Sequence, residues 1–114
     1  MDFKEYQELA ARTLNKEKGV ELTLVNMSFG LVGEAGETVD YMKKVLFHGH
    51  EFNVDKLASE LGDVLWYVAG MCSVLNVSLD EVAQFNIDKL IHRYPEGFKE
   101  EESVNRVEED EKQV

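Results

Sequence analysis

The apolar residues of this chain recur at the three- and four-residue spacing of an α-helix. The chain has a single proline, Pro95, so helices elsewhere meet no proline that would interrupt them. In the first segment Tyr6, Ala10 and Leu14 lie on one such stripe, which is typical of an amphipathic helix. Strand-type alternation of apolar and polar residues is scarce. The sequence therefore predicts an all-α fold.

Four helices are expected, separated by residues that start or stop them. Gly19 ends the first helix, and Asn53 or Asp55 caps the start of the third. Residues 78–81 form a capping box for the fourth helix, which the segment around Pro95 stops. We expect these helices to form a four-helix, bundle-like core. The expected ranges are about 3–18, 24–46, 55–75 and 78–94.

The charge of the chain excludes several classes of partner. Acidic residues number 23 and Lys plus Arg number 12, which gives a formal net charge of -11. A field of that sign repels polyphosphate backbones, so we expect neither a nucleic acid polymer nor a membrane as partner. A small anionic ligand would need a metal cation or a local basic patch.

The hydrophobic fraction of 44% is enough for the core of one domain.

Several features indicate a soluble, cytoplasmic protein. Cys72 is the single cysteine, which rules out an internal disulfide and fits a reducing compartment. It lies in the apolar run of residues 68–75, so we expect it to be buried rather than reactive. The N-terminus lacks the apolar segment of a signal peptide. The longest uncharged stretch, residues 64–79, is shorter than the about 20 residues needed to span a bilayer.

The composition changes at residue 99. From there to the end the chain holds seven acidic residues, and its only aliphatic residues are three valines. A segment of this kind buries little apolar surface. We therefore expect a domain over residues 1–98 and an acidic tail over residues 99–114. The tail is predicted to be mobile or loosely helical and dispensable for chemistry.

Two pairs of acidic residues give the strongest indication of chemistry. Glu34 and Glu37 lie in the second helix, and Glu60 and Asp63 lie in the third. Three residues turn a helix by about 300° and advance it by about 4.5 Å, so each pair lies on one face. The connection between these helices is short, which favours antiparallel neighbours. The four carboxylates can then converge on one spot.

Solvated surface acids are the alternative, since such pairs are common in an acidic chain. Two features favour a metal site. Asp63 is the only charged residue from position 61 to position 79, and a helix that is apolar nearly all round is buried. A buried carboxylate needs a cation or a proton. Glycines also surround the acids, at a cost of about 1 kcal/mol each in a helix, which suggests close backbone approach. They are Gly30, Gly33, Gly36 and Gly62.

Oxygen ligands without histidine or cysteine favour Mg²⁺ or Mn²⁺ over zinc. No histidine follows any of these acids at the three-residue spacing of a helical di-iron site. His48 and His50 lie only two residues apart in the loop between the second and third helices. They make a weak zinc pair, and a role in the loop, such as contact with a ligand, is the preferred interpretation.

Basic residues supply a second element of the pattern. Asn86, Lys89 and Arg93 form one stripe along the fourth helix. A solvated helix face is the alternative, because Lys and Arg are common near helix C-termini. Carboxylate-held Mg²⁺ together with such a stripe suits a nucleoside triphosphate, whose phosphate oxygens need both. The chain has no Gly-x-x-x-x-Gly-Lys-Ser/Thr loop, so it is not a P-loop enzyme.

The acidic motifs resemble those of a known family. Glu34-x-x-Glu37, 22 intervening residues and Glu60-x-x-Asp63 are similar to the signature of the MazG-like, all-α nucleoside triphosphate pyrophosphohydrolases. The resemblance covers roughly residues 6–98, and the order and spacing of its short pieces are specific. Two further stretches match blocks of the family, residues 57–67 and 86–98.

The resemblance implies an enzyme that cleaves an NTP or dNTP between the α and β phosphates, giving a monophosphate and pyrophosphate. Glu34, Glu37, Glu60 and Asp63 would hold Mg²⁺, with Mn²⁺ as a substitute. Glu34 or Glu37 would also orient or deprotonate the attacking water. Many members carry another glutamate directly before the first pair, where this chain has Gly33.

The resemblance also implies contacts to the substrate. Asn86, Lys89 and Arg93 would hold the phosphate chain, with Lys44 as a further candidate one helical stripe from Glu37. Base contacts are expected from Arg12 and Tyr6 in the first helix and from the loop at residues 47–52.

The family usually forms dimers or tetramers, and the apolar third helix independently favours a homodimer or homotetramer. Trp66, Met71 and Val74 are candidates for the subunit interface or, alternatively, for the core of the monomer. The alternative function is a non-catalytic helical protein that binds metal or nucleotide for assembly or regulation.

Overall fold

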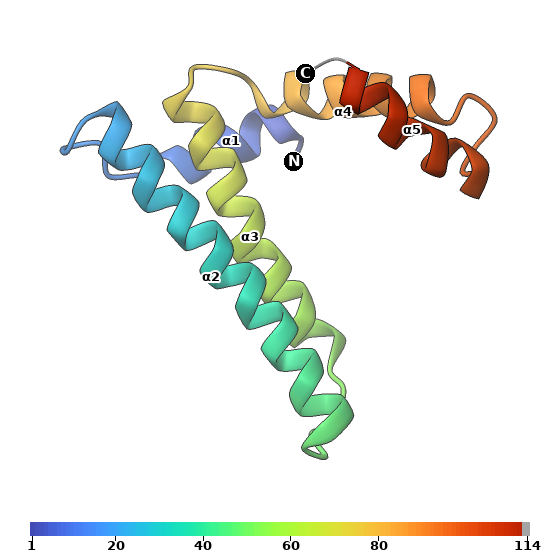
Figure 1. The fold of residues 1–114 in the computed structure, drawn as a ribbon. Helices are drawn as coiled ribbons and strands as arrows, with labels where there is room; N and C mark the ends of the chain where they lie inside the picture. The colour runs from blue at the N-terminus through green and yellow to red at the C-terminus, as the bar shows by residue number, and fades with distance from the viewer. Residues whose placement is uncertain (113–114) are drawn as a thin grey trace. The chain divides into compact units, whose positions relative to one another are not determined.

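The computed structural model describes the backbone of residues 1–112 and the side chains of residues 1–106. The described residues form five helices and no strand (Figure 1), so the predicted all-α fold is confirmed. The helices are α1 (Phe3–Ala11), α2 (Val20–Phe47), α3 (Val54–Val74), α4 (Leu79–Arg93) and α5 (Glu100–Lys112).

The chain divides into two compact units, Met1–Leu79 and Asp80–Val114. In the first unit, α3 packs against both α1 and α2. The second unit contains α5 and nearly all of α4. Among the described residues no single helix is long and apolar enough to cross a membrane, although α3 and α4 taken together pass that test by length and composition.

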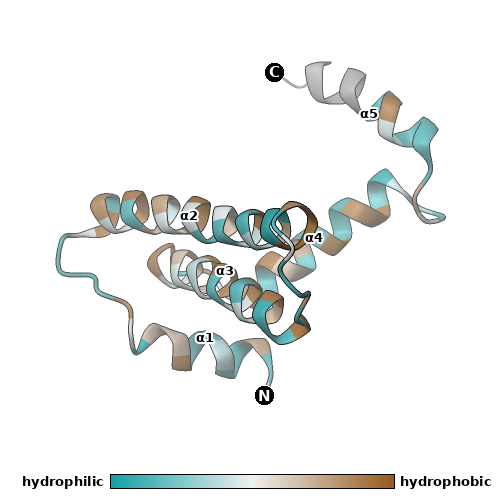
Figure 2. Ribbon diagram, turned by 90° about the horizontal axis from the view of Figure 1, so that it is seen from below, coloured by the Kyte–Doolittle hydropathy of each residue, from teal (hydrophilic) through white to brown (hydrophobic). Residues whose placement is uncertain are grey.

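The helices α2 and α3 form an antiparallel hairpin, as the short connection between them predicts (Figures 1 and 2). Asn53 is the N-cap of α3, and its side-chain oxygen accepts hydrogen bonds from the backbone N–H groups of Asp55 and Lys56. The Tyr41 hydroxyl accepts from the Asn53 N–H at 2.7 Å and donates to the Asn53 carbonyl at 3.2 Å. Tyr41 therefore fixes the loop to the end of α2.

The core of the first unit lies at the C-terminal half of α3. Ala69 and Cys72 are buried there together with Leu79, and Met27 of α2 packs against Gly70. Cys72 is buried as predicted, and burial raises the pKa of its thiol. The thiol is therefore held in its protonated, unreactive form.

Gln7 joins α1 to the segment that follows α3. Its amide nitrogen donates to the Ser73 hydroxyl at 3.2 Å and to the Val77 carbonyl at 2.9 Å. Its amide oxygen accepts from the backbone N–H of Leu79 at 2.7 Å. That N–H belongs to the first turn of α4, where it has no partner within the helix. One side chain thus secures three groups at the end of the core.

The first helix is shorter than predicted, ending at Ala11 instead of residue 18. After Ala11 the backbone N–H groups bond three residues back rather than four, as in a 3₁₀ turn. The Thr13 hydroxyl donates to the Ala10 carbonyl, and the Asn15 side chain accepts from the Glu17 N–H. These local bonds compete with helix formation.

The other helices lie close to their predicted ranges. α2 begins four residues earlier than expected, directly after Gly19, whose φ of 87° ends the preceding turn. α4 ends at Arg93, before Pro95, as predicted. The acidic segment from residue 99 forms α5, in line with the helical alternative for this tail. Its mobility stays a prediction, and residues 113–114 lie outside the described residues.

Candidate metal site

Three carboxylates meet where α2 and α3 lie side by side. Glu34 comes from α2, and Glu60 and Asp63 come from successive turns of α3. One carboxylate oxygen from each lies within 4.8 Å of the others. The antiparallel hairpin therefore brings together residues that are 26 and 29 positions apart in the sequence.

Glu37 lies outside this group of three, although the sequence pairs it with Glu34. It is exposed on the next turn of α2. Its negative charge still acts on Glu34 and contributes to raising the pKa of that residue. Glu37 is thus beside the cluster without being one of its closest members.

Asp63 is exposed, so the prediction of a buried carboxylate was wrong. Glu34 and Glu60 are half-buried. Asp63 is exposed because it lies in the part of α3 that other helices do not cover. Leu61 in this part is 53% exposed, and burial becomes complete only at Ala69. The cluster sits at the open half of the hairpin, where a ligand can reach it from solvent.

The electrostatics of the cluster are unfavourable without a cation. The pKa of Glu34 is raised, first by partial burial and then by the negative charges of Asp63, Glu60 and Glu37. Among the side chains of residues 1–106, no ion pair involves the three clustered acids. A divalent cation would relieve this repulsion, and an all-oxygen donor set suits Mg²⁺ or Mn²⁺.

Gly30 sets the distance between the helices one turn from the cluster. A Cβ atom at this position would overlap the ring of Tyr67, so the ring lies directly on the backbone of α2. The predicted close approach is confirmed at Gly30. At Gly33, Gly36 and Gly62 it was wrong, because a Cβ atom there would meet nothing within 4 Å. The sequence did not single out Tyr67 for this role.

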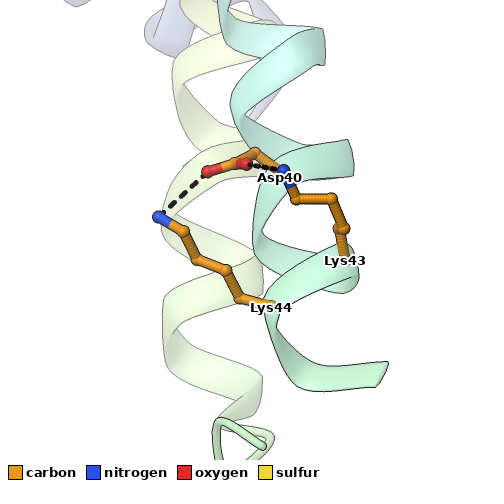
Figure 3. Close-up of polar contacts among 3 residues, drawn as sticks. All are labelled: Asp40, Lys43 and Lys44. Atoms are coloured by element: carbon orange, nitrogen blue, oxygen red, sulfur yellow. Dashed lines mark ion pairs between the residues drawn. The ribbon is translucent and has the colours of Figure 1, made fainter. Parts of the chain in front are cut away.

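Lys44 is held by Asp40 on its own helix (Figure 3). The Lys44 ammonium lies 3.0 Å from one Asp40 oxygen, and that of Lys43 lies 3.2 Å from the other. These hydrogen bonds lower the pKa of Asp40, and the bond to Asp40 raises the pKa of Lys44. The four-residue spacing of Asp40 and Lys44 is a sequence signal for such a pair. Contact between Lys44 and a phosphate would have to compete with Asp40.

The first helix brings Tyr6 toward the acidic cluster. Tyr6 is half-buried, and its pKa is raised by burial and by the charge of Asp63. Arg12 follows α1 and is exposed. The indole N–H of Trp66 donates to the Thr13 hydroxyl at 3.0 Å, and the Trp66 ring meets the edge of Tyr67 with centroids 4.9 Å apart. Of the predicted base-contacting residues, Tyr6 is thus linked electrostatically to the cluster.

The basic stripe lies on α4. Asn86 and Lys89 are exposed and Arg93 is half-buried. The Lys89 ammonium lies 5.8 Å from the centre of the Phe85 ring, a distance at which a cation and an aromatic face attract. The stripe is thus a surface feature of the second unit, and its contact with a substrate stays a prediction.

The two loop histidines do not form a pair with a third ligand among the described residues. His48 is the C-cap residue of α2. His50 lines a pocket of about 360 Å³ at the tip of the hairpin, together with Tyr41, Phe52 and Lys56. A role in the loop therefore remains the preferred interpretation for both.

The MazG nucleotide pyrophosphohydrolase domain family matches residues 22–98, a range that includes the whole acidic cluster and the basic stripe. The chain belongs to this family. It is also 42% identical over 84 residues to the Gene 37 protein of Mycobacterium phage L5, with 70% of this chain and 74% of the phage protein covered. No solved structure matches the chain. The suspected membership is thus confirmed, and the family name indicates a hydrolase that acts on nucleotides.

Proposed function

We propose that this protein is a Mg²⁺-dependent pyrophosphohydrolase that cleaves a nucleoside or deoxynucleoside triphosphate between the α and β phosphates. The observation that carries the proposal is the cluster of Glu34, Glu60 and Asp63 oxygens within 4.8 Å of one another. It is supported by membership of the MazG family. Mn²⁺ is expected to replace Mg²⁺, because both accept carboxylate oxygens.

The three clustered carboxylates hold and orient the cation in this proposal. When bound, a divalent cation supplies positive charge to the phosphate oxygens and makes water a better nucleophile at neutral pH. Glu37 lies beside the cluster and is exposed, so it is free to accept the proton of the attacking water. A bond then forms between that water and the α phosphorus as pyrophosphate leaves with the bridging oxygen.

The remaining charge of the triphosphate calls for basic groups. We assign this role to Asn86, Lys89 and Arg93, with Lys44 and Arg12 as further substrate contacts. Lys44 would then exchange Asp40 for a phosphate oxygen. Such an exchange is feasible because the Lys44–Asp40 pair is partly exposed and ion pairs of that kind contribute little stability.

We also propose that the protein acts in the cytoplasm as a homodimer or homotetramer. The single cysteine suits a reducing compartment. Trp66, Met71 and Val74, the interface candidates from the sequence, are all half-buried in the isolated chain. Apolar side chains with greater exposure lie on α2, among them Phe29, Val32 and Val39.

Release of pyrophosphate from a panel of NTPs and dNTPs in the presence of Mg²⁺ tests the proposed activity. Glu37→Gln should abolish release while Mg²⁺ still binds, and Glu60→Gln should lose both. Glu17→Gln, an exposed loop residue outside the cluster, is the matched control and should behave like the wild type. Orthophosphate as the first product would reject α–β cleavage. Nucleotide binding without turnover would favour the non-catalytic, regulatory alternative.

A further inference from the structure

A pocket of about 280 Å³ lies in the second unit, where the chain turns from α4 into α5. Two of its lining residues are arginines from different helices. Arg93 is the last residue of α4, and Arg106 belongs to α5. We call this cavity the arginine pocket, and all of its lining residues belong to one compact unit. They are His92, Arg93, Pro95, Glu102, Asn105 and Arg106.

The turn between the two helices is held by local contacts. The Gly97 N–H donates to the Tyr94 carbonyl at 3.1 Å. Gly97 also has a φ of 92°, which residues with a side chain rarely adopt. The rings of Tyr94 and Phe98 pack together with their centroids 5.2 Å apart. These contacts set the direction in which α5 leaves α4, and they thereby bring the two arginines to one pocket.

The arginine pocket concentrates positive charge in a strongly negative protein. The chain has a net charge of -11, yet two guanidinium groups and the His92 imidazole line this one cavity. Arg93 and Arg106 are both half-buried. Within residues 1–106 no ion pair neutralises Arg93. Two cations that line the same cavity repel each other, so an anion bound between them would stabilise the pocket.

A structural ion pair with Glu102 is the alternative explanation for the two arginines. The contacts of Glu102 argue against it. Its Oε2 atom is buried and has no hydrogen-bond partner among the described residues, so this oxygen accepts from neither arginine. A buried acceptor without a donor is costly. The pocket therefore suits a ligand that is anionic and also brings an O–H group for Glu102.

We propose that the arginine pocket binds the two terminal phosphates of the nucleoside triphosphate, with Arg106 as a further substrate-binding residue. A guanidinium group suits a phosphate, because it can donate two parallel hydrogen bonds to it. A phosphate group has a second pKa of about 6 and keeps part of its protons near neutral pH, and Glu102 accepts a hydrogen bond from that proton. The inference rests on the proposed function, which already assigns Arg93 to the phosphates.

This assignment gives the C-terminal segment a role in the reaction. Composition alone predicts that residues 99–114 are dispensable for chemistry. Arg106 lies in that segment, so its removal should weaken the binding of phosphate groups. Lys89 precedes Arg93 by four residues, about one helical turn. The basic stripe of α4 therefore leads into the arginine pocket, and α5 extends it.

Binding of inorganic pyrophosphate to the full chain tests the pocket without turnover. Titration calorimetry in EDTA excludes binding through a metal at the acidic cluster. Arg106→Gln should weaken binding by about 10- to 100-fold, the scale for loss of a hydrogen bond between charged groups. Lys99→Gln is the matched control, because Lys99 pairs with Glu96 at 2.9 Å outside the pocket, and it should bind like the wild type.

Circular dichroism establishes that both variants fold. The absence of pyrophosphate binding to the wild type would overturn the proposal. Equal losses of affinity in the two variants would also overturn it, because general electrostatics and not the pocket would then account for the binding.

Sulfate tests the role of Glu102. It has the tetrahedral shape of phosphate but carries no proton near neutral pH, so it offers no donor to a carboxylate, which can only accept. Inorganic phosphate should displace pyrophosphate from the wild type, whereas sulfate should not. In Glu102→Gln the amide can donate, so sulfate should compete as well. Glu101→Gln, an exposed neighbour outside the pocket, should still exclude sulfate. Exclusion of sulfate by Glu102→Gln would refute this role.

Steady-state kinetics with Mg²⁺ separate substrate from free pyrophosphate as the occupant of the pocket. Arg106→Gln should lower kcat/KM for the triphosphate by about 10-fold or more, as loss of a substrate contact predicts, and Lys99→Gln should not. An unchanged kcat/KM together with weakened pyrophosphate binding would overturn the assignment to the substrate. Pyrophosphate binding that depends on Arg106, in a protein without turnover, would support the anion pocket while rejecting the proposed activity.

Discussion

Replacement of Gly30 by alanine tests whether the spacing of α2 and α3 controls the metal site. The added methyl group would overlap the ring of Tyr67. Glu34 follows Gly30 by four residues and Asp63 precedes Tyr67 by four, a rise of about 6 Å along each helix. A shift that relieves the overlap therefore acts one turn away from the clustered carboxylates.

The expected magnitude follows from two opposing terms. Alanine in place of glycine stabilises a helix by about 1 kcal/mol, and overpacking a closed contact costs about 1–3 kcal/mol. Gly62→Ala is the matched control, because a Cβ atom at Gly62 would meet nothing within 4 Å. The helix term is common to both variants. The free energy of unfolding of Gly30→Ala should therefore lie about 1–3 kcal/mol below that of Gly62→Ala.

Urea denaturation and titration calorimetry with Mg²⁺ measure the two consequences. Besides the loss of stability, Gly30→Ala should weaken Mg²⁺ binding by on the order of 10-fold, the scale found when residues that support metal ligands are changed. Tyr67→Ala removes the ring, and in that background Gly30→Ala should become stabilising. Equal effects of Gly30→Ala in the two backgrounds would refute the reasoning, since the methyl group would then have some other contact.

Three further predictions concern charge and hydrogen bonding. The pKa of Glu34 is raised, so its ionised form is disfavoured in the folded protein. Without metal, the free energy of unfolding should therefore increase as the pH falls toward the ordinary glutamate pKa from above, because the folded state takes up the proton first. Because protons compete with Mg²⁺, the rise in melting temperature caused by Mg²⁺ should shrink over the same range, and a constant rise would contradict this account. Glu60→Gln should raise the melting temperature without Mg²⁺, by relief of repulsion, and abolish the rise that Mg²⁺ causes, as scanning fluorimetry can measure. Gln7→Leu should lower the free energy of unfolding by about 1–3 kcal/mol, because it leaves the Leu79 N–H without its acceptor; Gln84→Leu, which removes only an exposed bond to Asp88, is its control in urea denaturation.

Much of the fold could be predicted because its signals are local. Asn53 caps the start of α3, and Pro95 lies just beyond the end of α4. Both signals are local, because a capping side chain and the proline ring constrain the backbone over only a few residues. The end of α1 was missed since Thr13 and Asn15 form side-chain bonds that apolar periodicity does not report. Helical patterning thus located elements better than it located their ends.

The candidate site was predictable in part. The sequence positions of Glu34, Glu60 and Asp63, together with an antiparallel arrangement of α2 and α3, were enough to predict that these three carboxylates meet. The exposure of Asp63 was not predictable, because it depends on how far along α3 the neighbouring helices reach. The place of Glu37 likewise depends on how the two helices are rotated about their axes, which a three-residue spacing leaves open.

The contact between Trp66 and Thr13 gives the protein an intrinsic optical probe. Trp66 is the chain's only tryptophan. Its indole N–H donates to Thr13, two residues beyond the end of α1, and it lies three positions from Asp63. Its emission wavelength therefore reports whether the N-terminal helix is docked, without any label. Titrations with nucleotide or metal can follow that docking in real time, with no background from a second indole.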